Sequence, residues 1–404
     1  MPRLGSRILL LGGDADFNVG DRAILTALTR CLSLHDPSAE LTVVGHPALH
    51  ASLPGVTRVI PRGPRGLRAL LAAAAAADRV LIAGGGLFQD DDSRAKMPYW
   101  AARVALLKAC NSRIAALAIG AGPLQHAESR AAARLACAAL TSVSVRDRFA
   151  RDALAACTSR PVEVVADPAF MLEPAPPEAA REHLQRLGIS PGRPLIAVAM
   201  RRWFHERGGF LPNQIKYAIG IEPKRDLPRF EAVLGVIARS LEQLAGQLDA
   251  DILLLPGYNV GHEADDAACE TLRWRLPGAR AHLARVADPR LYKSLLGAAR
   301  LVISARMHPL ILAAGMGVPF VGLSYNGKFD GLYDRLGLTT RSLPLDLCPD
   351  GWGVTTLVAA AQAALELPVD LRQRSEALAS QVRAHTLALA FEARPARVLE
   401  AADA

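Results

Sequence analysis

The sequence predicts two α/β domains, each built on a doubly wound parallel sheet, which face each other across a cleft. Short β-rich apolar runs alternate with amphipathic helical segments, as expected of parallel sheets covered by helices. A proline-rich stretch at residues 173–194 interrupts this alternation and is typical of an interdomain connection with a short helix inside it. The chain has 404 residues, 51% of them hydrophobic, which is enough for two sizeable cores.

The first domain is expected at residues 1–175. Its expected strands occupy residues 7–13, 41–46, 79–86, 113–120, 142–147 and 162–168. Between the first two strands, the apolar side chains share one helical face, and the alanine-rich run at residues 72–77 also indicates a helix.

The second domain is expected at residues 190–368. Its expected strands occupy residues 194–200, 251–257, 279–284, 300–305 and 318–325. Asp288 followed by Pro289 is a cap-and-first-turn signal for the helix before residue 301. The tail at residues 370–404 is predicted to be an amphipathic helix that packs back toward the first domain.

Charge and cysteine usage limit the function classes. Lys and Arg number 47 against 39 Asp and Glu, giving a net charge of +8, which favours anionic partners. Aromatic residues are only 5% and the basic residues are dispersed, so the pattern argues against a nucleic-acid partner. The six cysteines form no CxxC pair, so neither a zinc site nor a disulfide framework is indicated, and a cytoplasmic protein is expected. We expect neither a signal peptide nor a spanning helix, and any membrane contact should be peripheral.

Polar residues follow the expected strands of the first domain, where ligands of open parallel sheets gather. Asp14, Asn18 and Asp21 follow the first strand, although turn and helix-cap chemistry accounts equally for them. Gln89 and Asp90 follow the glycines of the third strand, which lack the GxGxxG spacing of a dinucleotide site. The run of three aspartates at residues 90–92 fits a solvated acidic loop better than a metal site.

Basic residues mark further strand ends. Arg146 follows the fifth strand and can pair with the adjacent Asp147 or contact a ligand. Arg201 and Arg202 end a strand of the second domain, and because strand side chains alternate, we expect at most one of the two to face the cleft, with a surface position as the alternative.

The stretch at residues 301–328 is almost wholly apolar, yet it holds Arg306, His308 and Lys328. Arg306 and His308 fall in a strand-to-helix turn, and Pro309 suits the first helical turn. The free N–H groups of such a helix start attract anions. A core histidine with a surface arginine and lysine is the alternative, but three basic residues on neighbouring strand ends favour an anion site.

Six motifs in one order resemble the polysaccharide pyruvyl transferase family, in particular its CsaB-like, cell-surface-anchoring branch. They are NVGDRAI at residue 18, GGGLFQDD at 84, AIGAGPL at 118, SVRD at 144, ADPAF at 166 and ISARMHPLILAAGMGVPFVGLSYNGK at 303. Arg22 stands where the family usually has an acid, and Ala150 where a serine is common.

The resemblance implies a GT-B-like fold and transfer of a pyruvyl group from phosphoenolpyruvate onto two hydroxyls of a sugar. The product is commonly a 4,6-ketal, and in the cell-wall branch the acceptor is a lipid-linked oligosaccharide containing ManNAc whose product anchors S-layer proteins. No cofactor and no metal are implied. A place at the inner face of the cytoplasmic membrane would fit such an acceptor.

The chemistry of this reaction assigns roles to the strand-end residues. A donor with a phosphate and a carboxylate needs fixed cations, and protonation of its methylene carbon needs an acid. We therefore expect His308 to be the acid and the following residues to bind phosphoenolpyruvate: Arg306, Lys328, Arg202 and Arg146. The acceptor sugar is expected against Asp14, Asn18, Asp21, Gln89 and Asp90. The base stays open, with the departing phosphate as one candidate.

Two other functions stay open at this point. A GT-B glycosyltransferase that uses a sugar nucleotide would need the same basic cleft and strand-end glycines. A non-catalytic binder of carbohydrate or polyprenyl phosphate would keep the cleft, although binding alone does not need the histidine's proton.

Overall fold

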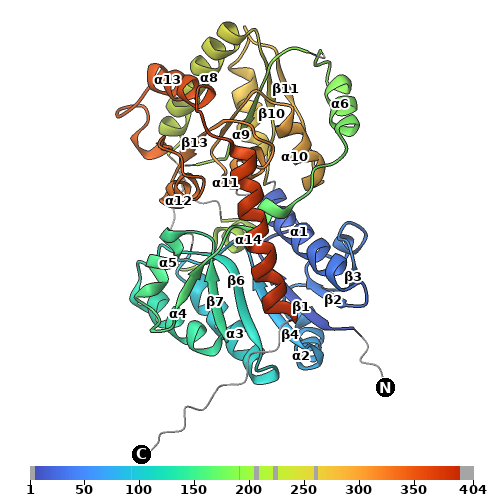
Figure 1. Cartoon of the computed structure of the whole chain (residues 1–404). Coiled ribbons are helices and arrows are strands. Elements are labelled where there is room, and N and C mark those ends of the chain that lie inside the picture. Colours follow the sequence, from blue (N-terminus) through green and yellow to red (C-terminus); the bar gives the residue numbers. More distant parts are fainter. Residues whose placement is uncertain are drawn as a thin grey trace, which may run out of the picture.

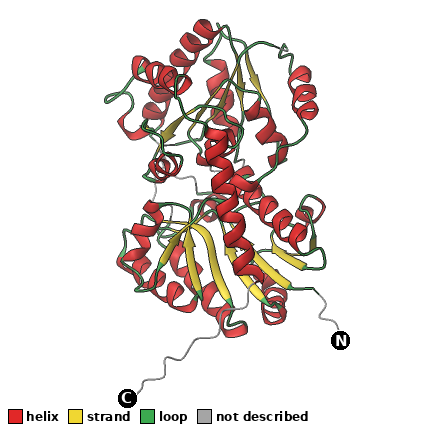
Figure 2. Cartoon of the chain, viewed as in Figure 1, coloured by secondary structure: helices red, strands yellow, loops and turns green. Residues whose placement is uncertain are grey.

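Two α/β domains lie one above the other, and a long helix runs along both (Figure 1). The computed structural model describes residues 5–91, 93–190, 192–203, 209–221, 226–258 and 263–391. In each domain helices cover a central sheet, as Figure 2 shows.

The first domain is a doubly wound sheet of parallel strands in the order β3-β2-β1-β4-β6-β7-β8, with β5 paired to β6. Its strands are β1 (Arg7–Gly12), β2 (Glu40–Val44), β3 (Val56–Ile60), β4 (Arg79–Ala83), β5 (Gly86–Phe88), β6 (Ile114–Ala121), β7 (Ser142–Val145) and β8 (Val162–Val164). Its helices are α1 (Val19–His35), η1 (Pro47–Ala51), η2 (Pro64–Gly66), α2 (Leu67–Ala76), α3 (Lys96–Cys110), α4 (Ala127–Ala139), α5 (Arg148–Ala155) and η3 (Pro168–Met171).

The second domain has a parallel sheet in the order β11-β10-β9-β12-β13-β14. Its strands are β9 (Leu195–Ala199), β10 (Asp251–Leu254), β11 (Ala281–Leu283), β12 (Leu301–Ser304), β13 (Phe320–Ser324) and β14 (Leu343–Pro344). Its helices are α6 (Pro177–Arg186), α7 (Asn213–Ala218), α8 (Leu227–Leu248), α9 (Asp265–Trp274), α10 (Pro289–Gly297), α11 (Met307–Ala314), α12 (Lys328–Arg335), η4 (Leu345–Leu347) and α13 (Val354–Leu365), and α14 (Leu371–Phe391) follows.

The predicted fold class is confirmed, and each expected strand is present. Three short strands were not predicted, because their sequences carry little strand signal. β3 has Arg58 at its centre, β5 has three residues, and β14 has two, one of them Pro344. The Asp288 signal is also confirmed, since its side chain accepts the Arg290 N–H at the start of α10.

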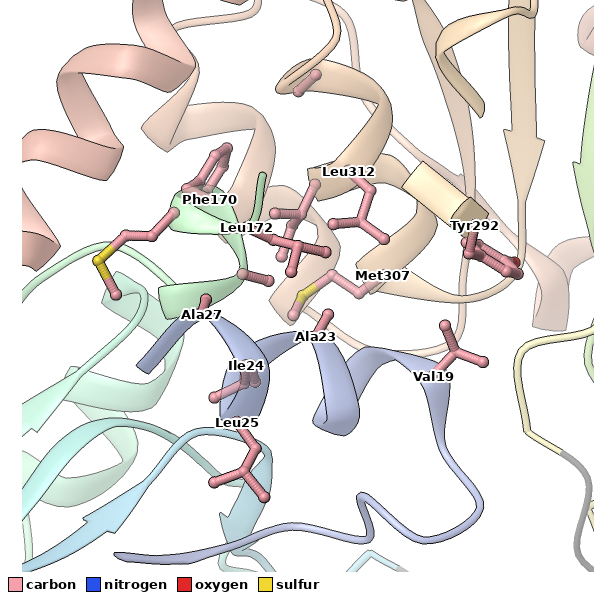
Figure 3. Close-up of a cluster of buried hydrophobic side chains, with 14 of the residues drawn as sticks. Val19, Ala23, Ile24, Leu25, Ala27, Phe170, Leu172, Tyr292, Met307 and Leu312 are labelled. Carbon is pink, nitrogen blue, oxygen red and sulfur yellow. The ribbon is translucent and has the colours of Figure 1, made fainter. Parts of the chain in front are cut away.

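A continuous apolar core joins the two domains (Figure 3). Val19 and Ala23 of α1 are buried against the second domain, whose α11 contributes Met307 and Leu312, while Phe170 of η3 belongs to the same cluster. Burial of this apolar surface stabilises the contact between domains. The packing also sets the first turn of α1 beside the first turn of α11, and this position decides the geometry of the site.

Helix α14 returns from the second domain across the first (Figure 1). His385 Nε2 lies 2.9 Å from Ser144 Oγ of β7, and the Phe391 ring packs on His35 with centroids 4.8 Å apart. The helix therefore ties the two domains together.

Candidate active site

A cavity of about 610 Å³ opens between the domains. It lies where strands of both sheets end, as expected for ligand sites of doubly wound folds. The first domain lines it with the loop after β1, the β5 region and α3, and the second with the turns before α11 and α12. The predicted cleft is thus a defined space into which side chains of both domains project.

His308 lies in this cavity, in the first turn of α11, where Arg306 is the N-cap residue. The imidazole packs directly on Gly20 of α1: a Cβ at that glycine would stand 2.7 Å from the His308 Cβ and closer to the ring. Asn18 starts α1 by accepting N–H groups of Gly20 and Asp21. The NVGD motif therefore caps a helix and leaves room for the histidine.

On its other side, His308 faces a buried carboxylate. Its Nε2 lies 3.6 Å from Asp167 Oδ2, and the same oxygen accepts a hydrogen bond from Arg146 Nη1 at 3.1 Å. The second oxygen of Asp167 accepts the Ala169 N–H at 2.9 Å. Burial opposes ionisation of Asp167, but His308 and Arg146 outweigh it and lower its pKa to about 2.

Arg146 is held in place by its surroundings. Its guanidinium lies against Gly120, where a Cβ would be 2.9 Å from Nη2, and its Nε is 3.5 Å from Asp147 Oδ2. The side chain lines the cavity although only 5% of it is exposed. Gly120 in the AIGAGPL motif thus makes room for a positioned cation.

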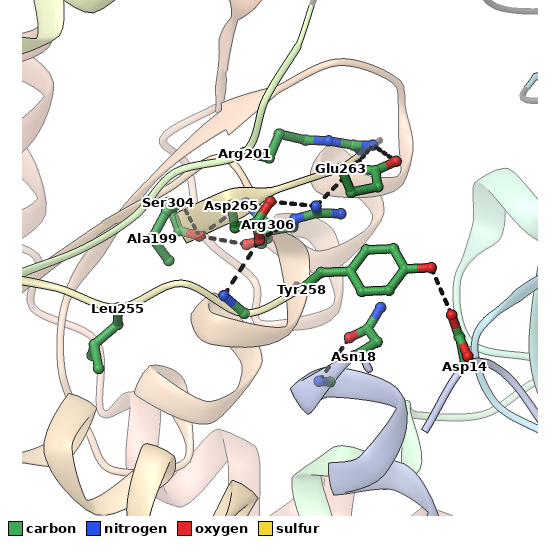
Figure 4. Close-up of polar contacts among 12 residues, drawn as sticks. Asp14, Asn18, Ala199, Arg201, Leu255, Tyr258, Glu263, Asp265, Ser304 and Arg306 are labelled. Atoms are coloured by element: carbon green, nitrogen blue, oxygen red, sulfur yellow. Dashed lines mark hydrogen bonds and ion pairs between the residues drawn. The ribbon is translucent and has the colours of Figure 1, made fainter. Parts of the chain in front are cut away.

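Arg306 occupies a buried cluster of four charges (Figure 4). It donates to Asp265 at 2.6 and 3.0 Å and to Glu263 at 2.7 Å, while Arg201 donates to both oxygens of Glu263 at 2.8 Å. Burial raises the pKa of Asp265 to about 6, Glu263 adds to the rise and Arg306 opposes it. The guanidinium of Arg306 therefore binds protein carboxylates here. For the predicted contact with phosphoenolpyruvate, the same guanidinium would have to bind the donor in addition to these carboxylates.

Lys328 begins α12 and lines the cavity beside Tyr325. Its Nζ lies 4.3 Å from the Tyr325 ring centroid, and Arg201 Cζ lies 4.4 Å from the same centroid. Burial lowers the pKa of Lys328, with Arg146 acting in the same direction and Tyr325 opposing it. These groups form a cationic wall opposite the first domain.

The expected acceptor residues Asp14, Asn18, Asp21 and Gln89 all line the cavity. Asp14 accepts the hydroxyl of Tyr258 from the second domain at 2.7 Å, a contact shown in Figure 4. Asp21 Oδ2 accepts the backbone N–H of Asp14 at 2.7 Å and so shapes the loop.

Two predicted site residues do not line the cavity. Asp90 is 1% exposed and accepts the N–H groups of Gln125 and His126, so it fixes the start of α4. Arg202 is half-buried and is not among the residues that line the cavity, whereas its neighbour Arg201 is. The backbone after β9 thus selects the other arginine of the pair. Asp92 of the same acidic run lies outside the described residues.

Several residues in or beside the cavity were not assigned from the sequence. Asp167 follows β8 in the ADPAF motif, so its position after a strand was an available signal. Tyr325 likewise follows β13 directly. Glu263 and Asp265 had no such signal, since acidic residues before a helix are ordinary caps. Among the described residues no group of three or more His, Cys, Asp or Glu is placed to hold a metal ion, and no helix is long and apolar enough to cross a membrane.

The fold and the cavity define a two-domain GT-B-like α/β protein with its site between Rossmann-like halves. The sequence profile of polysaccharide pyruvyl transferases matches residues 18–327. The chain therefore belongs to the polysaccharide pyruvyl transferase family, which makes it a transferase. A search of curated proteins finds no match.

Solved structures share the fold at low sequence identity. A putative UDP-N-acetylglucosamine 2-epimerase from Listeria monocytogenes has a TM-score of 0.55 at 13% identity, over 96% of each chain. The UDP-GlcNAc 2-epimerase from Neisseria meningitidis has a TM-score of 0.54 at 12% identity, over 94% of this chain and 99% of that one. The E. coli ADP-heptose lps heptosyltransferase II has a TM-score of 0.48 at 16% identity, over 89% and 98%. The likeness to the epimerases concerns the fold alone.

Proposed function

We propose that the protein transfers a pyruvyl group from phosphoenolpyruvate to two hydroxyls of a sugar, forming a cyclic ketal and releasing inorganic phosphate. The observation that carries this proposal is the position of His308, held between Gly20 and the buried Asp167 in a cavity that also contains Arg146 and Lys328. A proton donor among fixed cations suits an enol phosphate.

Lys328 and Arg146 bind the phosphate and carboxylate of the donor in this proposal. Arg201 takes the place that the sequence assigned to Arg202, because it is the arginine that lines the cavity. Arg306 contributes through its fixed position beside the start of α11, where backbone N–H groups add to the attraction for an anion.

His308 donates its proton to the methylene carbon of phosphoenolpyruvate. Positive character then develops on the neighbouring carbon, where the first sugar hydroxyl attacks; phosphate leaves and the second hydroxyl closes the ring. Asp167 orients the imidazole and supplies the negative charge that a protonated ring pairs with, as in other histidine–carboxylate pairs.

The acceptor binds against the first domain, where Asp14, Asn18, Asp21 and Gln89 offer hydrogen-bonding groups to sugar hydroxyls. We propose a 4,6-ketal on ManNAc of a lipid-linked cell-wall precursor, made at the cytoplasmic face of the membrane and used to anchor S-layer proteins. This rests on the CsaB-like motifs.

An exposed apolar surface at the cavity mouth supports a lipid-linked acceptor. It comprises Phe210, Leu211, Ile215, Tyr217, Ile219 and Ile221, of which Leu211 and Ile215 also line the cavity. Phe210 is 72% and Ile219 59% exposed, and Lys96 and Arg103 of α3 line the same cavity. Apolar surface beside basic groups suits a bilayer with anionic headgroups.

The catalytic assignment is tested with His308→Gln. Purified enzyme, phosphoenolpyruvate and a synthetic ManNAc-containing acceptor should yield phosphate and a ketal detectable by mass spectrometry, and the variant should lose both while keeping its melting temperature. Near-normal turnover of the variant would end the acid assignment. Product formed from a sugar nucleotide instead would favour the glycosyltransferase alternative.

The lipid proposal is tested separately by co-sedimentation with anionic phospholipid vesicles. Ile219→Glu should reduce binding, whereas Leu135→Glu, at a residue 70% exposed on α4, is the matched control. Equal vesicle binding by both variants would contradict the proposed membrane contact of this surface, and it would leave the proposed pyruvyl transfer unaffected.

A further inference from the structure

Tyr325 is a titratable cavity residue to which the proposed reaction gives no role. It follows β13, is half-buried, and lines the cavity together with His308 and Lys328. The ring packs against Trp203 with centroids 4.4 Å apart, so its position is fixed on one side by a buried side chain. Its hydroxyl therefore belongs to a positioned ring rather than to a mobile surface residue.

Positive charges surround this ring from three elements. Lys328 comes from α12, Arg201 from the end of β9 and Arg306 from the turn before α11. Among the described residues, the negative groups nearby are Glu263 and Asp265, which pair with the two arginines, and Asp91, which acts on Lys328. Burial alone would raise the pKa of Tyr325, but Lys328 and the arginines outweigh it and lower the pKa to about 7.

Four carboxylates in or beside the cavity have structural partners. Asp14 accepts the Tyr258 hydroxyl, and Asp21 accepts a backbone N–H. Glu263 and Asp265 receive hydrogen bonds from arginines. A base for a sugar hydroxyl needs a group that can lose and regain a proton near neutral pH, close to the donor cations.

We propose that Tyr325, as its phenolate, is the general base that takes the proton of the first attacking sugar hydroxyl; this rests on the proposed pyruvyl transfer. The ring stands beside Lys328, which binds the donor, and lines the same cavity as the acceptor residues. A base at this place can serve the hydroxyl that attacks the donor carbon.

The protons of the reaction balance with two residues. In the first step the phenolate of Tyr325 takes the proton of one hydroxyl, the oxygen bonds to the donor carbon, and His308 gives its proton to the methylene. In the second step phosphate leaves with the bonding electron pair and takes the proton held by Tyr325. The second hydroxyl bonds to the same carbon and gives its proton to His308. Both residues return to their starting forms, and the products are the ketal and hydrogen phosphate.

The ionisation is testable without any turnover. The chain has six tyrosines, and burial raises the pKa of Tyr258, Tyr292 and Tyr333, so these stay protonated near neutral pH. Ultraviolet difference spectra should therefore show a tyrosinate that titrates near pH 7 in the wild type and is absent in Tyr325→Phe. Tyr217→Phe, at an exposed residue of α7, should keep the signal. No such ionisation in the wild type would overturn the proposal.

The kinetic test uses the same variants in the phosphate-release assay. Tyr325→Phe should lower kcat by about 10²- to 10⁴-fold, the usual contribution of a general base, while the KM for phosphoenolpyruvate stays within about threefold. The wild-type rate should fall on the acid side as the phenolate is protonated, and this limb should vanish in Tyr325→Phe.

Asp91 is the competing base to exclude, since it also lines the cavity. If Asp91→Asn removes the acid limb and Tyr325→Phe keeps it, the base is Asp91 and the inference is wrong. If the wild type shows the tyrosinate but transfers no pyruvyl group, the proposed function fails instead. The spectra thus separate the two outcomes.

Discussion

Gly20→Ala provides a direct test of how the two domains build the site. An alanine Cβ at this position would stand 2.7 Å from the His308 Cβ, where ordinary contacts begin at 3.4 Å. An ordinary contact would require the two Cβ atoms to separate by a further 3.4 − 2.7 = 0.7 Å, and the histidine ring atoms, which start closer, by more. A displacement of about 1 Å at a reacting group can cost roughly 10²-fold in rate.

The same change should not weaken the helix itself. Gly20 lies in the first turn of α1, and alanine is favoured over glycine inside a helix by roughly 0.5–1 kcal/mol. We therefore expect kcat/KM for phosphoenolpyruvate to fall about 100-fold, or about 2.7 kcal/mol, while the melting temperature changes by only a few degrees.

Gly246→Ala is the matched control for this experiment. Gly246 lies in α8, and a Cβ there would meet nothing within 4 Å. This variant should keep full activity and gain a little stability. A Gly20→Ala enzyme with the wild-type rate, or one that loses activity only by unfolding, would refute the proposed contact with His308.

Other features of the site make further predictions. Asp167 has a pKa of about 2 in the folded protein against an ordinary 3.8. Its ionised form therefore adds about 2 kcal/mol to the free energy of unfolding above pH 3.8, and this contribution is lost as the pH falls through 2. Asp167→Asn should have a lower free energy of unfolding than the wild type at neutral pH, and the two should become equal in acid. Asp90→Ala removes the acceptor of two N–H groups before α4 and should lower the free energy of unfolding in urea by about 1 kcal/mol. The KM for the acceptor should stay unchanged, and a raised KM would show that Asp90 contributes to acceptor binding. Arg306→Gln leaves two buried carboxylates without that guanidinium and should cost about 3–5 kcal/mol in the same denaturation assay, and a loss below 1 kcal/mol would contradict the cluster. Phosphoenolpyruvate binding should take up protons near pH 6, because an anion raises the pKa of Asp265, which lies at about 6 in the free protein; calorimetry in buffers of different ionisation enthalpy would show no buffer dependence if this were wrong.

The sequence predicted the fold well because apolar strand runs and helical faces are local patterns. The same locality explains why His308, Arg146 and Lys328 line the cavity, since each lies in a turn after a strand whose end is at the cleft. The periodicity of a strand does not predict the direction of a side chain beyond the end of that strand. Arg201 and Arg202 differ by one position, and the backbone after β9 decides which faces the cavity.

Contacts between residues far apart in the sequence could not be predicted either. Arg306 binds Asp265, 41 residues away, and His308 packs on Gly20 of the other domain. Nothing local distinguishes Asp90, which caps a helix, from Asp91, which lines the cavity. These assignments require the spatial arrangement of elements that are distant in the chain.

The charges of the cavity are arranged in two groups with different consequences for catalysis. Arg201 and Arg306 are compensated by Glu263 and Asp265, so they contribute fixed geometry more than net charge. Lys328 lies beside Tyr325, whose proton can leave or return near neutral pH. The proposed base must be without its proton when the sugar hydroxyl attacks, so Lys328 serves the phenolate of Tyr325 as well as the anionic groups of the donor.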